Sequence, residues 1–140
     1  MYDMLDSSIK ECEYDDINAA NEWYDVVIDI ATKYLDKLQE DDWKKLFDAL
    51  PQKSVIWKKR LCDCLMGEED NYRLKALLIM ANTDDIGLFS MVISCLTFYD
   101  ASSIENIESL YKKVEQNIDK VQGYYQEKFR EFLEKKNRVR

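Results

Sequence analysis

The sequence predicts an all-α fold, a short α-solenoid of two helix pairs capped by an N-terminal helix and a long C-terminal helix. Three Gly and one Pro among 140 residues leave little for the tight turns of an all-β protein. Hydrophobic residues make up 46% of the chain and recur at the spacing of amphipathic helices. We expect residues 1–140 to form a single helical domain, with the acidic, weakly patterned residues 1–16 as a flexible start.

The first strong helical pattern runs from about residue 18 to residue 39. Lys33, Asp36 and Lys37 fall on its face toward water. The hydrophobic residues step by three and four and should face the core: Trp23, Val27, Ile30, Ala31, Tyr34 and Leu38. The pattern predicts one helix that caps the solenoid.

The first helix pair is expected over residues 41–66. Two hydrophobic stripes carry Trp43 and Trp57, which we expect in the core. Side chains with capping or helix-ending chemistry mark the helix boundaries: Asp41 and Asp42, Pro51, Ser54 and Gly67.

The second helix pair is expected over residues 70–98. Asp70 or Asn71 can open its first helix, and Asp84 or Asp85 can cap its second. Residues 91–99 are rich in β-branched and aromatic side chains, so a buried strand is the competing interpretation there. The helix is favoured because no neighbouring segment offers a second strand. Helix pairs of this size stack into α-solenoids.

The last element is expected to be one helix over residues 104–132, about 45 Å long at 1.5 Å per residue. Ser102 and Glu105 have the spacing of a capping box at its start. Gly123 lies inside the pattern and would allow a bend. An apolar stripe runs along the expected helix: Ile104, Ile107, Tyr111, Val114, Ile118, Val121, Tyr125, Phe129 and Phe132.

The net charge is −8, and it is unevenly distributed. Residues 1–50 carry −9, residues 51–110 carry −3, and residues 111–140 carry +4. An acidic body repels phosphate backbones, so direct nucleic-acid binding is not expected. The same field attracts a basic protein.

Neither a membrane span nor a secretion signal is expected. The longest uncharged run, residues 86–99, is shorter than the roughly 20 residues of a membrane span. The first residues are acidic and lack the basic region of a signal peptide. We therefore expect a cytoplasmic protein, whose four cysteines are buried, reduced thiols.

The sequence offers no catalytic constellation, and we expect no enzyme, no cofactor and no metal site. The chain has no His, which removes His-based triads and ligands. It has no CxxC, nucleophile-elbow or phosphate-loop motif. Paired acids recur, but most lie where a helix starts, where they cap backbone N–H groups. An all-α metal-dependent hydrolase remains the third class, and it would require tight Mg²⁺ binding.

The predicted solenoid gathers acids at one edge, where helix starts and helix ends meet. Tyr72 and Tyr99 lie beside this edge, and exposed Tyr is favoured at recognition surfaces. Glu40 belongs to the same edge. The candidate partner-binding residues are Asp41, Asp42, Glu68, Glu69, Asp70, Tyr72 and Asp100.

Residues 42–96, about 40% of the chain, resemble small α-helical immunity proteins of bacterial polymorphic-toxin and contact-dependent growth inhibition systems. The resemblance follows a W-x-x-L…W-x-x-R-L…L-L…D-D…L pattern. Its residues are Trp43, Leu46, Leu50, Trp57, Arg60, Leu61, Leu65, Leu74, Leu77, Leu78, Asp84, Asp85, Phe89 and Leu96. It implies HEAT-like helix pairs and a non-enzymatic protein that binds a cognate toxin domain and blocks its active site. Many such toxins are nucleases with basic clefts, so a basic toxin domain is the implied partner.

The alternative function is a helical adaptor that self-associates through residues 104–132 as a coiled coil. An unpaired surface stripe of Ile, Val and Tyr would be sticky, whereas packing within the chain would leave a monomer. A monomer is expected, with a homodimer as the alternative. A concentration-dependent molecular mass separates the two.

Overall fold

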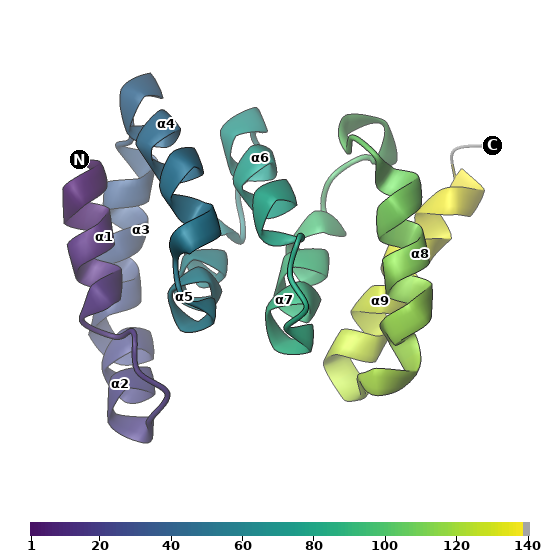
Figure 1. The fold of residues 1–140 in the computed structure, drawn as a ribbon, viewed down its shortest axis with the longest axis horizontal. Helices are drawn as coiled ribbons and strands as arrows, with labels where there is room; N and C mark the ends of the chain where they lie inside the picture. Colours follow the sequence, from purple (N-terminus) through teal and green to yellow (C-terminus); the bar gives the residue numbers. More distant parts are fainter. Residues whose placement is uncertain (139–140) are drawn as a thin grey trace. The chain divides into compact units, whose positions relative to one another are not determined.

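The computed structural model describes residues 1–138 and is all-α over that range (Figure 1). The chain divides into two compact units, Met1–Met80 (unit 1) and Ala81–Arg140 (unit 2). The division falls between the two helices that the sequence pairs over residues 70–98. The predicted all-α fold is confirmed.

Unit 1 contains six α-helices among its 80 residues, all of them described. Short helical segments of other types also occur: a π-helical turn Trp23–Val27 and a 3₁₀ turn Leu50–Gln52. The α-helices are α1 (Tyr2–Lys10), α2 (Ile17–Glu22), α3 (Ile28–Asp36), α4 (Glu40–Ala49), α5 (Val55–Leu65) and α6 (Asn71–Met80).

Residues 2–10 form a helix, which corrects the expectation of a flexible start for this part of residues 1–16. In α1, the side chains of Tyr2, Leu5 and Ile9 are buried, and the helix packs against α3, α4 and α5. Asp6 accepts a hydrogen bond from Lys53 Nζ (2.7 Å), just before α5, and another from Trp57 Nε1 (3.0 Å), on α5. Apolar residues spaced three and four apart, as on one face of a helix, thus anchor this segment despite its acidic composition.

The helix expected over residues 18–39 contains a π turn that changes which residues are buried. Four residues advance an ideal α-helix by about 40° beyond a full turn, so a strict four-residue stripe drifts around it. The wider turn at Trp23–Val27 offsets part of this drift. The buried stripe keeps four-residue spacing: Ala19, Trp23, Val27, Ala31 and Leu35. Ile30, expected in the core, is instead 42% exposed.

Helix boundaries in the middle of the chain follow local capping chemistry. The Ser54 hydroxyl accepts from Trp57 N (3.1 Å), and the Asp85 carboxylate accepts from Leu88 N (2.8 Å), as expected. The start of α4 differs, because Gln39 is its N-cap and Asp42 occupies the third helical position of a capping box.

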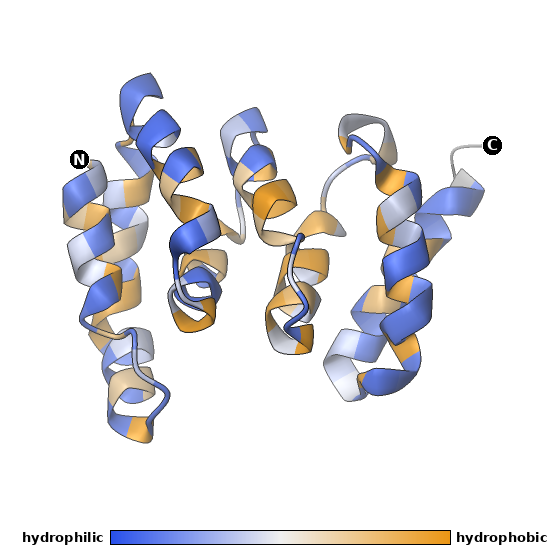
Figure 2. Cartoon of the chain, in the orientation of Figure 1, coloured by the Kyte–Doolittle hydropathy of each residue, from blue (hydrophilic) through white to orange (hydrophobic). Residues whose placement is uncertain are grey.

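Unit 2 contains α7 (Ile86–Leu96), α8 (Ile107–Asn117) and α9 (Gly123–Arg138), with 3₁₀ turns at Ala101–Ser103 and Ile118–Lys120. Residues 86–96 form a helix rather than a strand. Eight of its 11 residues are buried, and Figure 2 colours much of α7 as hydrophobic. It packs against α9.

The single long helix expected over residues 104–132 is divided into α8 and α9. The chain leaves helical geometry at Val121, and Gly123 starts α9 with a φ of +60°, a conformation that L side chains rarely adopt. Ser102 and Glu105 form no capping box, since Asn106 precedes α8 with a φ of 54°. Six residues of the apolar stripe are buried inside unit 2, where α8 and α9 pack together: Ile104, Tyr111, Val114, Val121, Phe129 and Phe132. The other three, Ile107, Ile118 and Tyr125, are half-buried.

Buried and half-buried cations bind carbonyl groups at several chain turns. Arg60 donates to Cys12 O (3.1 Å) in unit 1. In unit 2, Lys113 donates to the carbonyls of Ala81 and Thr83, and Lys135 donates to Thr97 O (2.9 Å) and Tyr99 O (2.6 Å). These charge-assisted bonds satisfy backbone acceptors where the chain turns.

Candidate protein-binding site

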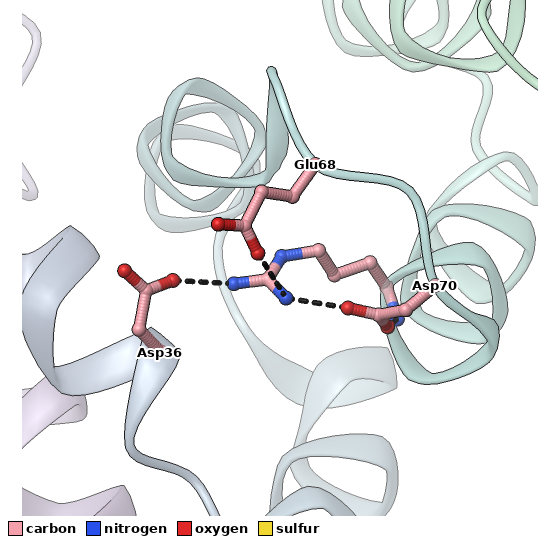
Figure 3. Close-up of polar contacts among 4 residues, drawn as sticks. Asp36, Glu68 and Asp70 are labelled. Carbon is pink, nitrogen blue, oxygen red and sulfur yellow. Dashed lines mark hydrogen bonds and ion pairs between the residues drawn. The ribbon is translucent and has the colours of Figure 1, made fainter.

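Arg73 organises a cluster of carboxylates in unit 1 (Figure 3). Its Nη2 lies 2.6 Å from Asp36 Oδ1 at the end of α3. Its Nη1 lies 2.5 Å from Asp70 Oδ2 and 3.3 Å from Glu68 Oε2, both in the connection between α5 and α6. The guanidinium therefore ties the end of α3 to the start of α6. We call Asp36, Glu68, Asp70 and Arg73 the Arg73 cluster.

The Arg73 cluster presents an excess of negative charge. The Arg73 side chain is 7% exposed, whereas Glu68 is 66%, Asp36 46% and Asp70 39% exposed. Three carboxylates surround one guanidinium, so the cluster carries a formal charge of −2. A cation arriving from solvent meets the carboxylates and not the guanidinium that holds them.

An aromatic stack borders the Arg73 cluster. The rings of Trp43 and Tyr72 are stacked, with centroids 5.5 Å apart and planes 10° from parallel. The Arg73 guanidinium lies 6.0 Å from the centroid of the Trp43 ring. Trp43 is buried, while Tyr72 is 44% exposed. Tyr72 therefore offers a rigid ring surface to solvent beside the acids.

The structure brings together three of the predicted residues, Glu68, Asp70 and Tyr72. Asp41 and Glu69 are exposed in the same unit, at the start of α4 and just before α6. Asp100 is exposed but belongs to unit 2, where it precedes the 3₁₀ turn Ala101–Ser103.

Two predicted members of the acidic edge have other environments. Asp42 accepts hydrogen bonds from Gln39 N (3.0 Å) and Tyr2 N (3.2 Å), and it lies 3.5 Å from the N-terminal ammonium. These backbone bonds, with the terminal charge, lower the pKa of Asp42, so its carboxylate stabilises the packing of α1 on α4. Tyr99, expected beside the edge, is 7% exposed and buried in unit 2.

Sequence reasoning missed Asp36 and Arg73 as members of this site. The three-residue spacing of Asp70 and Arg73 indicates a helical ion pair and could have identified Arg73. Asp36 lies 37 positions before Arg73 in the sequence, and no local pattern connects them.

Within the part of the chain that the structure describes, no group of three or more Cys, Asp or Glu side chains could hold a metal ion. None of the helices in residues 1–138 combines the length and hydrophobicity needed to cross a bilayer. All four cysteines are buried and form no disulfide. Burial raises the pKa of the Cys64 thiol to about 12, against a smaller opposing effect of its hydrogen bond with Thr32, so it stays protonated.

Comparison of the chain with protein-family models, with curated proteins and with solved structures gave no match. The function must therefore be inferred from the residues of this chain.

Proposed function

We propose that the protein is a non-enzymatic, HEAT-like immunity protein that binds and neutralises a cognate, basic bacterial toxin domain in the cytoplasm. The observation that carries the proposal is the surface of unit 1 where the exposed carboxylates of the Arg73 cluster lie beside the Trp43–Tyr72 stack. Exposed Tyr surrounded by charge is a common composition for a protein-recognition surface.

The charge of unit 1 supports a basic partner. Residues 1–80 contain 18 acidic and 11 basic side chains, for a net charge of −7, while residues 81–140 carry −1. A field of this sign accelerates encounter with a basic protein by orders of magnitude at low salt. Carboxylates can also occupy the positions that substrate phosphates take in the cleft of a nuclease-type toxin.

Burial in unit 2 favours this proposal over a self-associating adaptor. Six of the nine apolar residues that would form a coiled coil between two chains are already buried within unit 2, and the other three are half-buried. We therefore expect a monomer whose partner is a different protein.

The test is a pull-down of the tagged protein from a lysate of its source organism, at low and at high salt, with mass-spectrometric identification of the retained chains. We expect a basic polypeptide that is retained at low salt and released at high salt. Expressed alone, that polypeptide should arrest growth of a host cell, and co-expression of this protein should restore growth.

A matched pair of variants tests the surface. Asp41→Lys with Glu69→Lys reverses two exposed charges of unit 1, at the start of α4 and just before α6. Glu105→Lys with Glu108→Lys reverses two exposed charges near the start of α8 in unit 2. The first pair should weaken binding at least tenfold and flatten its salt dependence, and the second should change affinity less than twofold. Equal effects of the two pairs on affinity would show that these acids of unit 1 have no special role in binding. A retained partner that is acidic or harmless to the host would overturn the immunity proposal.

A further inference from the structure

The outer face of the helix that runs through α2, the π turn and α3 carries an apolar row beside an acidic row. Val26 and Ile30 are 55% and 42% exposed and lie four residues apart, one turn along the helix. Asp25 and Asp29 have the same spacing and are also exposed. We infer that this outer face, defined by Asp25, Val26, Asp29 and Ile30, docks onto an apolar recess bordered by basic residues on the partner. The inference assumes the basic partner of the proposed function.

The π turn creates this arrangement. In a regular α-helix, the sequence spacing places Ile30 in the buried stripe, and the π turn instead turns Ile30 toward solvent in the same row as Val26. Buried contacts hold the turn in place, because Trp23 Nε1 donates to Asp63 Oδ2 (2.9 Å) on α5. A π turn departs from the favoured hydrogen-bond geometry of the α-helix, and such turns occur often at functional sites. Here it exposes two β-branched apolar side chains.

The charge around the outer face identifies the chemistry of the partner. Residues 11–32 contain seven acids and no Lys or Arg. Neither Asp25 nor Asp29 forms an ion pair with any other residue in the range 1–138. Their carboxylates are therefore open to a cation of the partner, and the first basic residue after them is Lys33, one turn beyond Asp29. An apolar centre with a charged rim is the usual composition of a protein interface.

The same charge argues against other occupants. A second copy of this chain bound face to face would place acids against acids, which costs free energy. Nucleic acids and anionic membranes carry phosphates that the seven acids repel. A basic protein is the occupant that the charge favours.

The experiment places the photo-crosslinking amino acid p-benzoylphenylalanine at three positions in separate strains of the source organism. Position 30 probes the outer face, position 72 probes the Trp43–Tyr72 stack, and position 116 is an exposed control on α8. We expect position 30 to give an adduct with a basic protein, identified by mass spectrometry, and position 116 to give none with that protein.

Titration of that purified partner then tests the two rows. Val26→Ser with Ile30→Ser should raise the Kd at least tenfold, while Ile86→Ser, an exposed Ile of unit 2, should change it less than twofold. Asp25→Asn with Asp29→Asn should reduce the slope of log Kd against log salt concentration. Circular dichroism confirms that the exposed substitutions leave the fold intact.

The outcomes separate this inference from the proposed function. An adduct between two copies of this chain at position 30, or an unchanged Kd for the Val26 and Ile30 variant, overturns the outer face as the docking site. A basic adduct at position 72 without one at position 30 overturns the inference and keeps the proposed function. If neither position gives an adduct with a basic protein, both the outer face as a docking site and the proposed function are overturned.

Discussion

The two acidic regions of unit 1 look alike in sequence but differ in what their carboxylates contact. In the Arg73 cluster, Asp36, Glu68 and Asp70 surround a buried guanidinium. On the outer face, Asp25 and Asp29 have no cation partner among residues 1–138. The first set therefore contributes to folding and the second adds only charge. In a cluster of acids, the carboxylates that make no contacts within the folded chain indicate a binding surface more clearly than those that do.

The largest effect is expected from removing the cation of the Arg73 cluster. Arg73→Met keeps much of the apolar stem but leaves three carboxylates without their guanidinium. We expect the free energy of unfolding to fall by about 2–3 kcal/mol, because the charge-assisted bonds of a buried guanidinium are lost, although the exposed carboxylates stay solvated. Urea denaturation measures it. Lys44→Ala, an exposed lysine on α4, is the control and should change stability by less than about 0.5 kcal/mol. An equally small effect of Arg73→Met would mean that its carboxylates are held by other contacts.

The next effect concerns Asp63, which holds the π turn beneath the outer face. Asp63→Ala removes the acceptor of Trp23 Nε1, a buried donor, and should lower the free energy of unfolding by about 2 kcal/mol. Asp63→Asn retains an acceptor and should cost less. If the alanine variant is as stable as the wild type, the Trp23–Asp63 bond does not hold the turn.

Asp63 also gives a pH dependence. Burial raises the pKa of Asp63 above 3.8, and bonds from Trp23 and Tyr24 with the charge of Arg60 offset this in part. Below pH 3.8 the carboxyl is protonated in both states. As the pH rises through the pKa that Asp63 has in the folded chain, the unfolded chain releases its proton more readily. The folded state therefore loses stability relative to the unfolded state. The stability of the wild type relative to Asp63→Asn should therefore decrease as the pH rises from 3.5 to 7, measured by urea denaturation.

Much of the fold could be predicted because its signals are local. Ser54 and Asp85 cap helices through bonds to backbone groups three residues away, so spacing alone locates them. The π turn and the break before α9 are different. An apolar stripe with three- and four-residue steps continues through Gly123, since both α8 and α9 bury it, and the pattern alone cannot show the turn between them.

The candidate site could be predicted in part. Glu68, Asp70 and Tyr72 lie within five residues, and the chain keeps them together wherever it folds. Asp36 joins them only through the packing of α3 in unit 1, a contact between distant positions. The sequence predicts that Asp42 is available to a partner, but in the structure it accepts a bond from Tyr2 N on α1. The acidic composition of residues 1–16 gives no sign of that helix.

A smaller effect is expected from Asp16, which shows that structural acids also occur in the acid-rich residues 11–32. Its Oδ1 accepts from Ala19 N (2.7 Å) and caps α2. Asp16→Ala should lower the free energy of unfolding by about 1 kcal/mol, the usual cost of losing an N-cap. Asp16→Ser keeps an acceptor and should restore most of it. Equal losses in both variants, measured by thermal unfolding, would show that charge and not capping is the contribution.

The smallest effect has the opposite sign. Asp25 and Asp29 are like charges one helical turn apart, and such pairs destabilise a helix by about 0.2–0.5 kcal/mol. Asp25→Asn should therefore raise the free energy of unfolding by about 0.3 kcal/mol, while Asp29 keeps its favourable spacing with Lys33 on the next turn. The gain should shrink at 1 M salt, where the Debye length falls to about 3 Å. A loss of stability would mean that these carboxylates support the fold, as those around Arg73 do. A gain in stability together with weaker partner binding is what residues kept for recognition should show, because their charge costs the folded chain and benefits only the complex.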